Sequence, residues 1–176
     1  GLGDVYKRQI IELESLGEGL ANFVTLLLCT LIRETLKANP LVDKDKPVRH
    51  VIFIEEAHNL IAPESQVKNG QDSNPKIAAT AFIVKMLAEV RALREGIIIA
   101  DQLPTAMAPE VIKNTNIKLV HRLTSADDRE LVGSTMSASP LQIENMATYT
   151  SGQALFTYEK LIRPFEMQVN LIDIHG

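Results

Sequence analysis

VIFIEEAHNL, residues 51–60, begins with four apolar residues and continues with two glutamates, an alanine and a histidine. A short apolar run rich in β-branched residues predicts a central parallel strand that is buried on both faces. Glu55 and Glu56 then stand at the carboxyl end of that strand, where α/β proteins bind their ligands. Adjacent strand residues point to opposite sides, so the two glutamates are not expected to act as a face-to-face acid/base pair.

The two carboxylates can instead divide the work of phosphoryl transfer. One can face the water shell of a magnesium ion while the other faces an attacking water, as at a Walker B strand end. The alternative is two solvated glutamates at the end of a strand.

A second apolar run, IIIA at residues 97–100, is followed by Asp101, Gln102, Leu103 and Pro104. We predict another strand that is buried on both faces, with Gln102 at its end. An amide is both donor and acceptor, so Gln102 can bond a phosphate oxygen and a water together. The alternative is a surface turn residue before the proline.

Arg91 and Arg94 close the helix that leads into this second strand. The helix dipole favours cations at that end in any protein. The sharper interpretation is an arginine finger that neutralises charge on a phosphoryl group bound by an adjacent subunit.

The remaining elements alternate between strand and helix patterns, which predicts an α/β fold with a parallel sheet. We expect a strand at 10–13, a helix from a capping box at Ser15–Glu18 to about Lys37, and a helix at 77–93 preceded by Pro75. Further along we expect a short helix at 109–114, a strand at 117–123 and helices capped at Ser125 and Ser139. The segments 152–158 and 164–169 suggest a terminal hairpin or edge strands.

Composition limits the class of protein. The chain has 176 residues, 45% hydrophobic and 23% charged, which fits one globular domain and excludes a disordered chain. A net charge of −4 excludes a protein that grips nucleic acid by bulk charge. The single cysteine, Cys29, predicts a buried thiol in a reducing cytosol. The apolar run at 23–32 is shorter than the roughly 20 residues of a membrane span and no signal peptide is visible, so we expect a cytoplasmic protein without membrane contact.

The first nine residues, GLGDVYKRQ, differ in pattern from the rest. They resemble a translated sequencing adapter, which predicts a non-native tail at 1–9 joined to a C-terminal part of a domain at 10–176. The alternative is an ordinary flexible tail.

Three segments in order, VIFIEEAHNL, MLAEVRALREGIIIADQLPT and PEVIKNTNIKLVHRLTSADDRE, resemble the C-terminal half of HerA/FtsK-type ATPases, over roughly Ile10 to Tyr158. These are RecA-like P-loop ATPases that translocate DNA. The resemblance implies a three-layer sandwich with a mostly parallel sheet, ATP and Mg²⁺ as ligands, a homohexameric ring and double-stranded DNA in its channel. A nuclease partner often accompanies such a motor.

Carried over by position, Glu56 matches the glutamate that polarises water and Gln102 matches the sensor. Glu55 matches the residue that assists magnesium, usually an aspartate, so the longer side chain puts its role in doubt. Arg91 fits the finger position better than Arg94.

Weaker expectations concern four other places. Lys113 can approach the nucleotide or merely end a helix, and Arg122 can reach phosphate or pair with Asp127 or Asp128. His58 can gate Glu56 or be a structural hydrogen-bonder. The loop at 62–74, with Lys68, is a candidate to face the ring channel or is an ordinary polar loop.

The sequence contains no G-x-x-x-x-G-K-[ST] run, the loop that cradles phosphates. Truncation is the simplest account, because in this family the P-loop lies upstream. The P-loop strand would separate the strands at 97–100 and 117–123, so we expect these two not to pair. The leading hypothesis is a DNA translocase or helicase subunit. A conjugation or secretion ring ATPase and a non-hydrolysing ring subunit are the alternatives.

Overall fold

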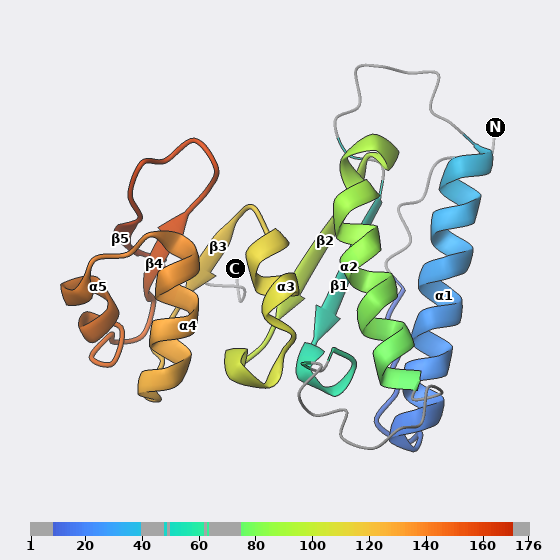
Figure 1. The fold of residues 1–176 in the computed structure, drawn as a ribbon, viewed down its shortest axis with the longest axis horizontal. Coiled ribbons are helices and arrows are strands. Elements are labelled where there is room, and N and C mark those ends of the chain that lie inside the picture. Colours follow the sequence, from blue (N-terminus) through green and yellow to red (C-terminus); the bar gives the residue numbers. More distant parts are fainter. Residues whose placement is uncertain (1–8, 40–47, 49, 62, 64–74, 171–176) are drawn as a thin grey trace, which may run out of the picture.

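The computed structural model describes residues 9–39, 48, 50–61, 63 and 75–170, in two sheets with helices packed against them (Figure 1). The helices are α1 (Glu18–Ala38), α2 (Pro75–Leu93), α3 (Pro109–Asn114), α4 (Ala126–Met136) and α5 (Pro140–Asn145). The strands are β1 (His50–Glu55), β2 (Glu95–Ala100), β3 (Lys118–Val120), β4 (Gln153–Thr157) and β5 (Phe165–Gln168). Two 3-10 turns, η1 (Ala57–Asn59) and η3 (Pro104–Ala106), follow β1 and β2.

The first sheet consists of β1 and β2, paired in parallel from His50↔Glu95 to Glu55↔Ala100. Both strands were predicted from their apolar runs, and both are confirmed. Because the first residues of the two strands pair with each other and the last residues do too, β1 and β2 end at the same level of the sheet. The residues that follow, Glu56 on one chain segment and Asp101 and Gln102 on the other, therefore leave the sheet at the same edge.

One face of this sheet forms the main hydrophobic core. Ile54 is 8% exposed and packs with α2 and α3, where Ile83 and Val111 are buried. The opposite face is uncovered by the described residues, since Phe53 is 57% and Ile98 49% exposed. The prediction of burial on both faces is therefore wrong for this chain, because helices lie against one face alone in the part that the structure describes.

The beginning of the chain differs from expectation. Residues 10–13 form no strand, and Ile10 is 77% exposed, because no described segment pairs with them. The expected capping box at Ser15 is also absent. Gly17 occupies the N-cap of α1 in place of Ser15, and no side chain caps this helix start because glycine has none to offer.

Helix α1 packs against α2 and carries the buried thiol predicted at Cys29, 5% exposed. Burial and the nearby Glu95 carboxylate raise the pKa of this thiol. By length and composition α1 also meets the requirement for a membrane span, a criterion that core helices of soluble proteins satisfy too. The expectation of no membrane contact remains a prediction.

The second sheet is antiparallel, in the order β3-β4-β5, and α4 and α5 cover it with a second core around Leu155 and Met146. The terminal hairpin is confirmed, as are the helix starts at Ser125 and Ser139. Each serine hydroxyl accepts a backbone N–H, and Ser139 forms the full capping box with Gln142.

β2 and β3 belong to different sheets, so the prediction that they do not pair is confirmed for the described residues. β3 is shorter than predicted and lies beside β4 instead of in a parallel sheet. The fold is mixed α/β, with one parallel and one antiparallel sheet. The three-layer sandwich and the strand expected between β2 and β3 stay predictions.

Candidate functional site

The candidate site lies at the carboxyl ends of β1 and β2, where Glu56 meets Gln102. The Gln102 amide nitrogen Nε2 donates to both carboxylate oxygens of Glu56, at 3.1 and 3.2 Å. Both side chains are exposed, so a ligand can reach them. The two predicted residues, 46 apart in the sequence, are thus brought into direct contact.

Glu56 has a left-handed backbone, with φ 47° and ψ 48°. This conformation is costly for a residue with a Cβ, and it is found preferentially at functional sites. The left-handed residue ends the extended backbone of β1, in which side chains point to alternate faces, and it caps the 3-10 turn η1. The carboxylate direction is therefore set by a sharp turn instead of by the strand.

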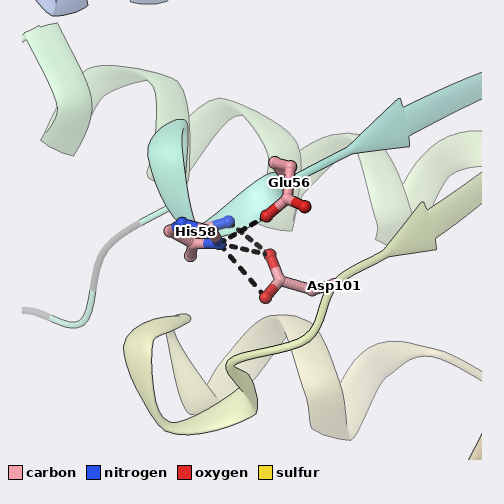
Figure 2. Close-up of side chains that lie close together, drawn as sticks. All are labelled: Glu56, His58 and Asp101. Carbon is pink, nitrogen blue, oxygen red and sulfur yellow. Dashed lines mark hydrogen bonds and ion pairs between the residues drawn. The ribbon is translucent and has the colours of Figure 1, made fainter.

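His58 and Asp101 complete the site, and Figure 2 shows their side chains turned toward Glu56. The His58 ring atom Nδ1 lies 3.0 Å from Asp101 Oδ2 and 3.5 Å from Glu56 Oε2. The backbone N–H of His58 donates to Asp101 Oδ2 at 2.7 Å. His58 is thus a hydrogen-bonding residue of the site, and its gating of Glu56 stays a prediction.

Asp101 is the residue that sequence reasoning missed. Its side chain is only 2% exposed, whereas that of Glu56 is 52% exposed. A buried carboxylate requires donors, and it finds them in His58 and in the backbone N–H of Leu103. A signal was present: Asp101 directly follows an apolar strand run, as Glu55 and Glu56 do.

The oxygen ligands at this edge suit magnesium in part. Glu55, the last residue of β1, is exposed, and its carboxylate together with that of Glu56 offers the hard oxygen atoms that Mg²⁺ prefers, directly or through water. Glu56, His58 and Asp101 each offer one ligand atom within 4.8 Å of the others. The imidazole and the fully bonded Asp101 fit a magnesium shell less well than Glu55 and Glu56 do.

The basic residues predicted for the site lie on several different elements. Arg91 lies in the last turns of α2, and its side chain is outside the described part. Arg94 has a left-handed backbone, φ 55°, directly after α2, and its side chain is half-buried. Lys113 is exposed in the last turn of α3, with no ionic partner among the described residues.

Arg122 lies after β3 instead of within a strand, and its Nε donates to the carbonyl of Ala147 at 3.1 Å. It pairs with neither Asp127 nor Asp128 in the described structure. Asp128 is only 6% exposed and accepts the N–H of Thr105. The loop at 62–74 lies outside the described residues, apart from residue 63.

A separate pocket of about 460 Å³ lies beside α5, lined by Ser137, Ser139, Gln142, Arg163 and Pro164. None of the predicted site residues lines it. This pocket is therefore separate from the candidate site at the strand ends.

No family model and no curated protein matches the chain. Among solved structures it is similar to VirB4 of Thermoanaerobacter pseudethanolicus, with a TM-score of 0.64 and 16% identity, over 92% of this chain and 40% of that one. It is also similar to the genome packaging NTPase B204 from Sulfolobus turreted icosahedral virus 2, solved with ATP-γS, with a TM-score of 0.54 and 15% identity. That match covers 81% of this chain and 62% of B204.

These similarities establish the fold, and the chain spans less than two thirds of either neighbour. The parallel pair, its helices and the antiparallel sheet agree with the fold of these two neighbours and with the α/β class expected from the sequence.

Proposed function

We propose that this chain is the catalytic-glutamate half of an ATP-hydrolysing motor subunit. The observation that carries the proposal is the contact between Glu56 and Gln102 at the ends of two neighbouring parallel strands. The left-handed backbone of Glu56 supports it, because stored strain is typical of catalytic positions. The likeness in fold to B204, a genome packaging NTPase solved with ATP-γS, supports the same class of activity.

In this mechanism the Glu56 carboxylate accepts a hydrogen bond from the attacking water and orients it toward the γ-phosphate. The Gln102 amide can release Glu56 and donate to a phosphate oxygen, while its carbonyl accepts from the water. Glu55 would hold Mg²⁺ through water, and the metal would neutralise phosphate charge. Arg91 is the proposed finger toward a neighbouring subunit, with Arg94, Lys113 and Arg122 as weaker candidates to approach the nucleotide.

The phosphate-cradling loop is a separate part of the proposal. This sequence has no Gly-rich loop that ends in Lys-Ser or Lys-Thr, so the 176 residues alone are expected to bind ATP poorly. We place that loop upstream in the natural protein. Residues 1–9 are, on the same view, not native.

The cargo proposed is double-stranded DNA, moved through a homohexameric ring in the cytoplasm, with a nuclease as a working partner. The net charge of −4 requires that DNA contacts be local and confined to channel-facing loops. A conjugation or secretion ring ATPase is the second candidate. The similarity in fold to both VirB4 and a genome packaging NTPase favours neither cargo.

The test uses the natural full-length protein and its ATPase activity with duplex DNA, with single-stranded DNA and without nucleic acid. Glu56→Gln should lower turnover by at least about 100-fold and leave nucleotide affinity unchanged, because it removes the charge that polarises water. Glu130→Gln is the matched control, since Glu130 is an exposed carboxylate on α4.

Stimulation by duplex DNA supports the translocase, and stimulation by single-stranded DNA alone supports the second candidate. A wild-type protein that binds ATP without hydrolysing it is the non-hydrolysing ring subunit. Turnover unchanged in Glu56→Gln removes the assignment of Glu56.

A further inference from the structure

The Asp101 carboxylate bonds the backbone of both segments that form the candidate site, the one after β1 and the one after β2. Its Oδ2 accepts the backbone N–H of His58 at 2.7 Å, and its Oδ1 accepts the backbone N–H of Leu103 at 2.7 Å. The His58 ring atom Nδ1 lies 3.0 and 3.2 Å from the same two oxygens. One carboxylate therefore binds the turn after β1 and the turn after β2.

These two tethers lie next to the two residues proposed to do the chemistry. Leu103 directly follows Gln102, and His58 lies in the 3-10 turn η1, whose N-cap is Glu56. The turn is closed by the N–H of Asn59, which donates to the carbonyl of Glu56 at 2.9 Å. Fixing His58 thus fixes the turn that keeps Glu56 in its left-handed conformation, and fixing Leu103 fixes the segment that carries Gln102.

The imidazole of His58 adds a second link. A carboxylate oxygen can only accept, so the bonds to Asp101 require that His58 Nδ1 carry a proton. The same Nδ1 lies 3.5 Å from Glu56 Oε2 (Figure 2), and the Gln102 amide nitrogen donates to that same oxygen at 3.2 Å. His58 is therefore oriented by a buried partner while it faces an exposed one.

We propose that Asp101 and His58 are a positioning pair that sets the geometry of Glu56 and Gln102 without touching the nucleotide. The inference rests on the function proposed above. Asp101 is 2% exposed at its side chain and its oxygens are occupied, so it acts through its neighbours and not on the substrate. Removing its charge releases both turns, and Glu56 then relaxes away from the position that orients water.

The test compares Asp101→Asn, His58→Ala and the double variant in the full-length protein. Asp101→Asn keeps the size of the side chain, and Asp127→Asn is the control because Asp127 is an exposed aspartate in the first turn of α4. We expect kcat to fall about 10- to 100-fold in Asp101→Asn, with nucleotide Kd within about threefold of wild type. The kcat of the double variant should fall no further than that of the more impaired single variant.

A kcat within twofold of wild type in Asp101→Asn overturns the positioning pair. A nucleotide Kd that rises by the same factor as kcat falls also overturns it. So does a double variant whose fall in kcat equals the product of the two single falls. A wild-type protein without ATPase activity instead refutes the proposed function. The pair is then judged by ¹⁵N NMR of the histidine ring: protonation of His58 Nδ1 in wild type and its loss in Asp101→Asn support it, and an unprotonated Nδ1 in wild type overturns it.

Discussion

The side-chain nitrogen of Gln102 lies 3.1 and 3.2 Å from the two carboxylate oxygens of Glu56. The contact joins the ends of two parallel strands that pair without interruption up to their last residues, Glu55↔Ala100. An acid and an amide are thus brought together by the sheet, with no ligand needed to assemble them. Groups placed before the substrate arrives lose little entropy when it binds, which is the advantage expected of a catalytic edge.

The left-handed backbone of Glu56 predicts a conflict between stability and function. Glu56→Gly and Glu56→Ala both remove the carboxylate, but glycine adopts φ 47° without a steric cost. We expect the glycine variant to be more stable than the alanine variant by about 1 kcal/mol, measured by urea unfolding. Equal stabilities would mean that this turn relaxes freely and is not strained.

Close packing of α4 on α5 predicts that Gly133 cannot be enlarged. A Cβ at this position would lie 2.5 Å from Ile143 Cγ1 and 2.9 Å from its Cδ1. Gly133→Ala should therefore lower the free energy of unfolding by about 1 to 3 kcal/mol. Gly19→Ala is the control, because a Cβ there meets nothing within 4 Å, and it should raise stability by about 0.5 to 1 kcal/mol. A neutral Gly133→Ala would contradict this packing.

Asp128 joins the two halves of the described structure. Its buried carboxylate accepts the N–H of Thr105, which follows β2, while Asp128 itself belongs to α4. Asp128→Ala leaves that N–H unpaired and should cost about 1 to 3 kcal/mol. Asp127→Ala, at the neighbouring and exposed aspartate, should lower the free energy of unfolding by less than about 1 kcal/mol. Chemical denaturation of both variants measures the difference, and equal costs would argue against the link.

Tyr149 predicts a loss of stability at high pH. Burial, together with the nearby Glu166 carboxylate, raises the pKa of Tyr149 from 10.0 to about 12. The unfolded chain loses this proton first as pH rises, so the free energy of unfolding should fall between pH 10 and about 12. Tyr149→Phe should show a shallower decline over that range in urea unfolding. Parallel pH profiles of the two proteins would exclude this tyrosine as the cause.

Local patterns were sufficient for most individual elements. The apolar runs predicted β1 and β2, Pro75 marked the start of α2, and Ser139 with Gln142 marked that of α5. They failed at residues 10–13, where apolar residues lack a partner strand in the described structure. An apolar pattern indicates that a segment can form a strand, whereas the strand forms only if another segment of the chain pairs with it.

At the site, the side chains at strand ends could be predicted because parallel strands deliver their carboxyl ends to one edge. The place of Asp101 after an apolar run was a signal for the site, but its role was not predictable, since that role comes from the N–H groups of His58 and Leu103 that its carboxylate accepts. The cations were the least predictable, because long flexible side chains bond whatever lies nearby, as Arg122 does with Ala147.

The sequence by itself determined where strands and helices form and which acid and amide stand at the strand ends, because these depend on residues close together in the chain. Only the tertiary structure decided that Glu56 contacts Gln102, that Asp101 is buried against His58 and Leu103, and that one face of the first sheet is uncovered in the described residues. Those features depend on register and packing between distant segments, which local periodicity does not encode.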